Sequence, residues 1–358
     1  MVDYLGITIL LGSFILLLIL RTPISFALLA SAILTSFYLK VPLMSVAVQM
    51  VKGIHSFSLL AIPFFILAGE IMGAGGISRR IIEFTNVLVG RVRGGLAQVN
   101  ILASMFFGGI SGSAIADVSS IGALLIPMMK DSGYDTDYAV DVTITSACQG
   151  LIIPPSHNMI IFAVSAGGVS VGQLFLGGML PGVLLGMALM IISYVIAVKR
   201  GYPKGAKISF KEAIKIASSA ILGLLTAVII IGGVIGGIFT ATESAAVACL
   251  YAFIVTFFIY REIPLSKMDE ILLNALRTLA TVLALLACCN AFGWFLAYLK
   301  IPALITGALL GVSNNKIVVL LLINLLLLAL GTIMDMAPLI MITTPILMPV
   351  IQSIGMNP

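Results

Sequence analysis

Apolar stretches long enough to span a membrane recur along this sequence from Leu5 onward. Hydrophobic residues make up 61% of the 358 residues, and charged residues only 9%. About 20 apolar residues in a helix cross the hydrocarbon core of a bilayer, whereas soluble domains carry about 25% charged residues. The sequence therefore predicts an all-α polytopic membrane protein. The first stretch lacks a basic leader and a small-residue cleavage site, so we interpret it as a retained helix.

The predicted spans follow the apolar stretches, and two of the segments are long enough to cross twice. The four cysteines lie in apolar runs without metal-ligand spacing and are interpreted as packing residues. The predicted spans are 5–20, 24–39, 57–73, a there-and-back pair over 98–130, 138–165, 174–198, 217–239, 241–260, 278–299, and a second pair over 317–354.

Basic residues are distributed unequally between the two predicted sides. Of the 19 lysines and arginines, all but Lys40, Lys52, Lys300 and Lys316 fall on the side reached after 57–73. Cytoplasmic loops carry such an excess, so this side is predicted to be cytoplasmic. The asymmetry holds only if 98–130 enters the membrane and returns, as two spans or as a re-entrant hairpin. The stretch GGISGSAIADVSS, residues 108–120, is then the turn of this pair.

A weak internal repeat relates this hairpin to the second predicted pair. The first hairpin opens to the cytoplasm and the second to the outside, which is the inverted arrangement of many secondary transporters. We predict scaffold helices over 1–56, a first inverted repeat over 57–198, a basic cytoplasmic linker over 199–216 and a second repeat over 217–358. The aligned residues are Gly109 with Gly331, Ser113 with Asp335, Pro127 with Pro349, and Gly133 with Gly355.

Polar breaks interrupt the apolar runs at 109–117, 150–158, 236–244 and 331–335. In GLIIPPSHN, two prolines remove N–H donors and free carbonyls upstream. Such carbonyls, with hydroxyl and amide oxygens, suit a hard cation, while the half-helix N-terminus that follows suits an anion. The sequence therefore predicts a site for sodium and a carboxylate together. Its predicted sodium ligands are Ser111, Ser113, Ser156 and Asn158, with Thr332 and Asp335 in the symmetry-related site.

Acidic residues inside the apolar runs are further candidates. Asp335 is costly in a membrane unless it is paired or hydrated, so we expect a functional role for it. Glu243, in TATES, is either a helix cap or a site residue. Glu70, Asp117, Thr240, Thr242 and Glu243 are predicted as polar support for the site.

Two other functions are open at this point. The sequence GISGS matches the GxSG motif of rhomboid-type intramembrane proteases, with Ser111 as nucleophile and His157 as its base. Such a protease needs neither inverted symmetry nor a second hairpin. The other alternative is an ion-coupled carrier of similar build that acts without a binding protein.

Several segments together resemble the large membrane subunit of TRAP transporters, the tripartite ATP-independent periplasmic carriers. They include LAIPFFILAGEIM at 60–72, GRVRGGLAQVNILASMFFGGISGSAIADVSSIG at 90–122, IIPPSHNMI at 152–160, GIFTATESAAVA at 237–248 and MITTPILMPV at 341–350. The resemblance implies a non-enzymatic, sodium-driven importer of an organic acid in the bacterial inner membrane, working by an elevator mechanism. It also implies a periplasmic substrate-binding protein and a small four-helix membrane subunit as partners. The sequence contains no GxxxxGK[ST] nucleotide-binding motif.

The resemblance and the polar breaks together define the expected site. Sodium, as the co-transported ion, is the one metal expected. The acid stays open among dicarboxylates, sialic acid and other sugar acids. The expected sodium-binding residues are Ser111, Gly112, Ser113, Ser156, Asn158, Gly331, Thr332 and Asp335, and the expected substrate-binding residues are Ser111, Ser113, Pro155, Ser156 and Asp335.

The second hairpin has no partner break in this sequence. In the first repeat the hairpin is followed by the broken helix at 138–165, whereas the second hairpin ends at 354, close to the last residue. Polar tip groups left in hydrocarbon cost several kcal/mol each. We therefore expect the natural protein to continue with a further proline-broken segment.

Overall fold

The computed structural model describes residues 3–205, 208–312 and 315–356, apart from the side chains of Ile110, Ser111, Leu310 and Val312. Residues 206 and 207 of the predicted basic linker thus lie outside it. Across these ranges the chain is helical and contains no strand, and Arg93 and Lys204 form an isolated antiparallel bridge. Within the described ranges, six helices are long and apolar enough to cross a membrane, or seven if one bent pair forms a single span. The predicted all-α, multi-pass fold is confirmed.

The chain divides into two compact units. One unit comprises Met1–Leu59, Ile161–Val169 and Thr278–Pro358, and the other comprises Leu60–Ile160 and Ser170–Arg277. The second unit holds both the first predicted hairpin and the proline break, so the first candidate site lies entirely within it. The second predicted hairpin belongs to the first unit.

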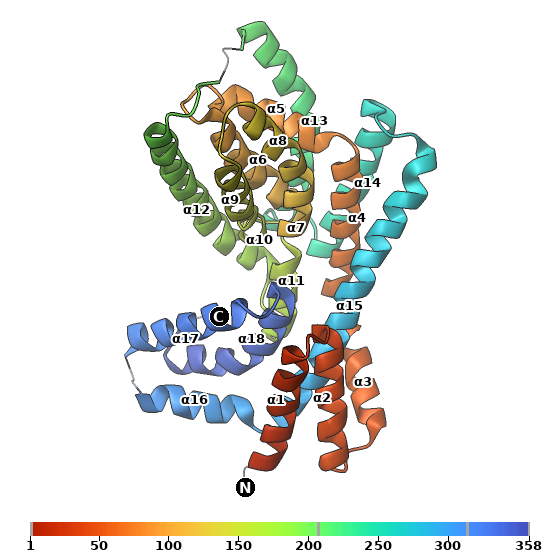
Figure 1. Cartoon of the computed structure of the whole chain (residues 1–358). Helices are drawn as coiled ribbons and strands as arrows, with labels where there is room; N and C mark the ends of the chain where they lie inside the picture. Colours follow the sequence, from red (N-terminus) through yellow and green to blue (C-terminus); the bar gives the residue numbers. More distant parts are fainter. Residues whose placement is uncertain (1–2, 206–207, 313–314, 357–358) are drawn as a thin grey trace. The chain divides into compact units, whose positions relative to one another are not determined.

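In the first unit, α1 (Tyr4–Ile19) and α2 (Ile24–Tyr38) pack side by side (Figure 1). They correspond to the first two predicted spans. The short helix α3 (Leu43–Ile54), which the sequence analysis missed, packs on α15 (Met268–Tyr298) through Gly53. A Cβ at Gly53 would lie 2.4 Å from the Cβ of Asn290, and the Asn290 side-chain amide donates to the Gln49 carbonyl at 2.6 Å. This close approach fixes α3.

The same unit contains α16 (Ile301–Val312), α17 (Lys316–Gly331) and α18 (Met336–Ser353). The predicted second pair over 317–354 is confirmed as α17 and α18, which contact each other and are joined by a four-residue turn, 332–335. The twelve-residue helix α16 was not predicted. It packs on α18, a helix that contains Pro345 and Pro349.

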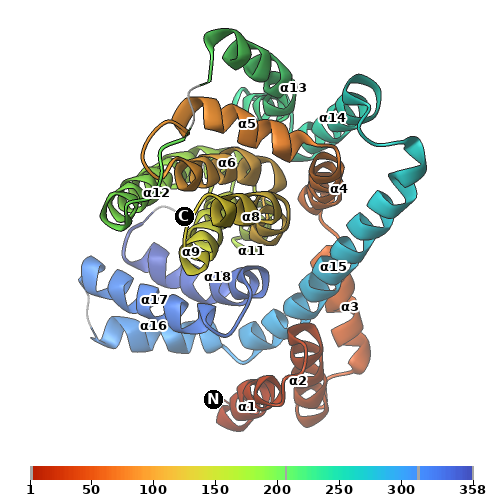
Figure 2. The ribbon, with the colours of Figure 1, turned by 45° about the horizontal axis from the view of Figure 1, so that its top comes forward.

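The second unit is built around α6 (Gly95–Ser111), which contacts helices that precede it and helices that follow it in the sequence. The amphipathic helix α5 (Ile77–Val89) of this unit packs between α13 (Phe210–Ile235) and α6 (Figure 2). The elements of this unit are α4 (Ala61–Ala74), α5 (Ile77–Val89), α6 (Gly95–Ser111), α7 (Ala114–Asp117), the π-helical turn η2 (Val118–Gly122), α8 (Ala123–Asp131), α9 (Thr136–Ala147), α10 (Gln149–Ile152), the start of α11 (His157–Ser165), α12 (Val171–Arg200), α13 (Phe210–Ile235), α14 (Ala241–Ile254), the π-helical turn η3 (Val255–Tyr260) and the start of α15.

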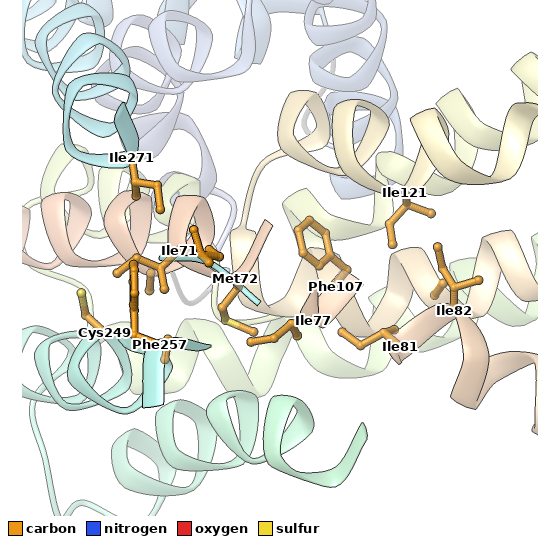
Figure 3. Packing of buried hydrophobic residues seen from close by; sticks show 14 of the residues in the cluster. Ile71, Met72, Ile77, Ile81, Ile82, Phe107, Ile121, Cys249, Phe257 and Ile271 are labelled. Carbon is orange, nitrogen blue, oxygen red and sulfur yellow. The ribbon is translucent and has the colours of Figure 1, made fainter. Parts of the chain in front are cut away.

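The core of this unit joins α4, α5 and α6. Met72, Ile77 and Ile81 are fully buried, and Phe107 from α6 packs among them (Figure 3). The helix α5 places isoleucines on this face and keeps Arg79 exposed on the other. This packing holds the first half of the hairpin rigidly against α4 and α5.

A tyrosine cluster closes the predicted cytoplasmic end of the unit. The rings of Tyr134 and Tyr202 stack with centroids 4.5 Å apart, and Tyr138 packs on both. Asp135, just before α9, accepts hydrogen bonds from the Tyr202 hydroxyl at 2.7 Å and from Arg200 at 2.9 Å. The cluster therefore ties the start of α9 to the end of α12.

Candidate functional site

The polar stretch at 108–120 forms the turn of a helical hairpin. The helix α6 is capped by Gly112, which has a left-handed φ of 62° and donates its N–H to the Gly108 carbonyl at 2.7 Å. Glycine adopts this conformation without the steric cost that a Cβ brings. Ser113 is then extended and caps α7, its hydroxyl accepting the Ala116 N–H at 3.3 Å. The chain reverses through η2 into α8, which packs back on α6.

The proline pair breaks the helix that follows the hairpin. The segment Thr136–Ile152 and the helix α11 are bent by 47° relative to each other at this break. Pro154 and Pro155, joined by a cis peptide bond, have no N–H groups, so the carbonyls of Gly150 and Leu151 lose their usual helical donors. The break therefore presents main-chain oxygens at a point where a continuous helix would hide them.

The hairpin tip and the helix break lie against each other, as the sequence predicts. A Cβ at Gly112 would lie 3.0 Å from the Ser156 Cα and 3.1 Å from the Pro155 carbonyl oxygen. One turn earlier, a Cβ at Gly108 would lie only 2.4 Å from the Cα of Gly150. The two backbones touch because both helices carry glycine at the crossing point.

Buried polar groups surround this contact. Ser156 is fully buried and Asn158 is 4% exposed. The Ser156 hydroxyl has no hydrogen-bond partner within the described part of the chain. An unpaired buried hydroxyl costs free energy unless a ligand or water satisfies it. Together with the freed carbonyls, this hydroxyl gives an oxygen-rich environment that suits a small hard cation.

Most of the other predicted site residues lie on neither the hairpin tip nor the helix break. The side chain of Ser111 lies outside the described residues. Thr240 and Glu243 form a capping box at the start of α14: the Thr240 N–H donates to the Glu243 carboxylate at 2.8 Å, and the Glu243 N–H donates to the Thr240 hydroxyl at 3.3 Å. Thr242 is buried beside them, and Glu70 is partly buried on α4. Asp117 is fully buried just beyond the hairpin tip.

The tip of the second hairpin is more open than the first. Gly331, Thr332 and Asp335 are exposed, whereas Met334 between them is buried. The Thr332 hydroxyl donates to the Ala329 carbonyl at 2.7 Å, and Asp335 precedes α18 without capping it through its side chain. The structure thus brings Thr332 and Asp335 onto one turn but does not bury them as it buries Ser156.

The sequence analysis missed a polar layer between α6 and α9. The Asn100 amide donates to the Thr143 hydroxyl at 2.7 Å, and the hydroxyls of Ser104 and Ser146 are 3.2 Å apart. Gln149 continues the layer, fully buried and with neither amide atom paired among the described residues. The available signal was helical spacing, because these polar residues recur three or four positions apart within apolar runs.

Comparison with known proteins identifies the family. Residues 11–358 match the family described as the tripartite ATP-independent periplasmic transporter, DctM component. The chain belongs to this family. The sialic acid TRAP transporter large permease protein SiaM of Vibrio cholerae is 43% identical over 87% of this chain and 73% of its own length. The uncharacterized protein YgiK of Salmonella typhimurium is 41% identical over 98% of this chain and 81% of its own length.

Other DctM-family relatives have different named substrates. The C4-dicarboxylate TRAP transporter large permease protein DctM of Pseudomonas aeruginosa is 37% identical over 88% of this chain and 73% of its own length. Among solved structures, the YdaH transporter of Alcanivorax borkumensis superposes with a TM-score of 0.60 at 14% identity, over 86% of this chain and 72% of that one. This likeness shows the fold alone. The resemblance to TRAP large subunits inferred from sequence is thus confirmed.

Proposed function

We propose that this DctM-family chain is the large membrane subunit of a sodium-coupled carrier that imports an organic acid across the bacterial inner membrane. The observation that carries the proposal is the contact between the hairpin tip at Gly112 and the proline break at Ser156. It concentrates main-chain oxygens and an unpaired hydroxyl in a buried place within a membrane protein. Carriers of broken-helix build bind ions at such places.

The proposed sodium ligands are the main-chain oxygens of the break together with the side chains of Ser111, Ser113, Ser156 and Asn158. Oxygen ligands without a carboxylate suit a monovalent ion, because a single positive charge needs no full compensating charge. The N–H groups at the start of α11 point the positive end of a helix dipole at the same place. A substrate carboxylate would be stabilised there, next to the sodium ion.

An organic acid is the substrate class that the relatives support. Large permease proteins of this family are named for sialic acid, 2,3-diketo-L-gulonate and C4-dicarboxylates. All three are carboxylic acids and are therefore anions at neutral pH. We propose that a periplasmic binding protein delivers the acid and that a small membrane subunit completes the carrier, in keeping with the tripartite family.

The proposed movement is an elevator motion, in which the hairpins and the broken helix cross the membrane as one body. Two hairpins that open to opposite sides can shield the site from each side in turn. A cysteine placed beside Ser113 should then react with an impermeant reagent from alternate sides, depending on sodium and substrate. Labelling from one side under every condition would contradict this motion.

Uptake into proteoliposomes tests the function. The intact protein, with its membrane partner, is reconstituted, and labelled organic acids are supplied with and without the binding protein under an inward sodium gradient. We expect accumulation that requires both the gradient and the binding protein. Uptake without the binding protein would identify the alternative carrier, and uptake that an equal potassium gradient drives would reject sodium coupling.

A further inference from the structure

Asp117 is a buried carboxylate that the hairpin tip does not use. It ends α7, one helical turn beyond Ser113, and is fully buried. Neither of its carboxylate oxygens has a hydrogen-bond partner in the described residues. The Ser104 hydroxyl of α6 faces the carboxylate, although the pair does not reach the geometry of an ordinary hydrogen bond.

Few ionisable groups lie near enough to compensate a charge on Asp117. The elements that pack most closely on α7 are α6, η2, α9 and α10. Of these, α6, η2 and α10 contain no ionisable side chain. The helix α9 contains Asp137, Tyr138 and Asp141, all acidic and all more than one turn before Ser146, where α9 meets Ser104. Glu70 on α4, which packs on α6, is acidic too. No described cation in these elements opposes a negative charge.

Burying an ionised carboxylate without a partner is far more costly than burying the neutral acid. A sodium ion would need several oxygen ligands, but neither Asp117 oxygen has a polar partner within hydrogen-bond geometry among the described residues. A proton needs no further ligands. We propose that Asp117 is a proton-binding site inside the first hairpin, occupied while α7 is packed against α6, α9 and α10.

The donors and acceptors of the polar layer are arranged in the order that a protonated Asp117 requires. The Ser146 hydroxyl donates its proton to the Thr143 main-chain carbonyl at 3.0 Å and to the Asn100 side-chain oxygen at 3.3 Å, and the Asn100 amide donates to the Thr143 hydroxyl. Thr143 in turn donates to the Ala139 carbonyl at 2.7 Å. Because Ser146 has one hydroxyl proton and gives it away, Ser104 must donate to Ser146. The Ser104 oxygen is then left to accept a proton from a protonated Asp117.

An ionised Asp117 would disturb this chain. It would take the Ser104 proton, so Ser104 would have to accept from Ser146. Ser146 could then donate neither to the Thr143 carbonyl nor to the Asn100 side-chain oxygen, and these buried acceptors would lose that donor. If Asp117 instead takes up a proton from water, the neutral acid donates to Ser104 and this loss is avoided. Release of the proton would therefore accompany a local separation of α7 from α6 and α9, a link that rests on the proposed transport function.

Infrared spectroscopy of the intact protein in lipid tests the site independently of transport. At pH 7 the wild type should show a carbonyl band of a protonated carboxylic acid, although an ordinary aspartate, with a pKa of about 3.9, is ionised there. The band should be missing in Asp117→Asn. It should persist in Asp141→Asn, a matched change of an exposed aspartate on α9. A band equal in wild type and Asp117→Asn would overturn the proposal.

A second variant keeps the test decisive if Asp117→Asn does not fold. Ser104→Ala removes the proposed acceptor but leaves the acid, so the band should move to higher frequency and keep its intensity. An unmoved band would contradict the Asp117 to Ser104 interaction. Added sodium at constant pH should leave the wild-type band in place, and its loss would show that Asp117 belongs to a cation site instead. Failure of uptake would count against the proposed function only.

Discussion

The crossing of Gly108 and Gly150 gives the clearest prediction, because two backbones meet there and no side chain can move aside for an added Cβ. A Cβ at Gly108 would lie 2.4 Å from the Gly150 Cα and 3.0 Å from its nitrogen. Carbon atoms pack at about 3.5–4.0 Å, so Gly108→Ala must separate the two backbones by on the order of 1 Å. Overpacking of this kind costs about 1–3 kcal/mol.

The intrinsic effect of the substitution has the opposite sign. Alanine is favoured over glycine in a helix by about 0.8–1 kcal/mol. Gly232→Ala in α13 isolates that effect, since a Cβ there would meet nothing within 4 Å. We therefore expect Gly108→Ala to unfold at a lower temperature than wild type and Gly232→Ala at an equal or higher one.

Thermal unfolding of the purified protein in detergent measures the difference. Gly150→Ala should resemble Gly108→Ala, since the reciprocal Cβ would lie 2.7 Å from the Gly108 Cα. The double variant should cost less than the sum of the two, because each substitution already forces the same two backbones apart. A Gly108→Ala protein as stable as Gly232→Ala would refute the close approach of hairpin and break.

Two further predictions concern other parts of the chain. The Tyr202 hydroxyl, and after it Arg200, hold the pKa of Asp135 below its usual range, so the stabilisation is present above the unfolded pKa of about 3.9 and is lost as the pH falls through the lower folded value. Thermal unfolding should therefore depend more steeply on pH below 4 in wild type than in Asp135→Asn, and equal slopes would contradict the contact. Asp335→Asn should strongly impair uptake while the protein still inserts into the membrane, and full uptake would remove Asp335 from the proposed second site.

The sequence predicted those elements whose signal is local. Apolar length indicated α12 and α14, and charge parity indicated that 98–130 must return, as α6 to α8 do. The helices α3, α5 and α16 were missed because they are short, and α5 is polar on one face, so none has the length of a span. Their positions depend on packing against neighbours distant in sequence.

The same distinction holds for the site. The pair Pro154 and Pro155 predicts a helix break from the sequence alone, and a glycine such as Gly112 indicates a sharp turn. The pairing of Gly108 with Gly150 depends on two helices crossing at one depth, which periodicity does not encode. Asp117 was predicted as polar support, but its lack of partners emerges only once α6, α9 and α10 surround it.

The sodium dependence of uptake in Ser113→Ala tests the central proposal most directly. This change also removes a helix cap, so Ser209→Ala is the matched control: its hydroxyl accepts the Glu212 N–H at 3.3 Å, the distance found for Ser113 and Ala116. We predict that the sodium concentration for half-maximal uptake rises several-fold in Ser113→Ala and is unchanged in Ser209→Ala. Equal sodium dependence in wild type and Ser113→Ala would contradict a sodium site at the hairpin tip.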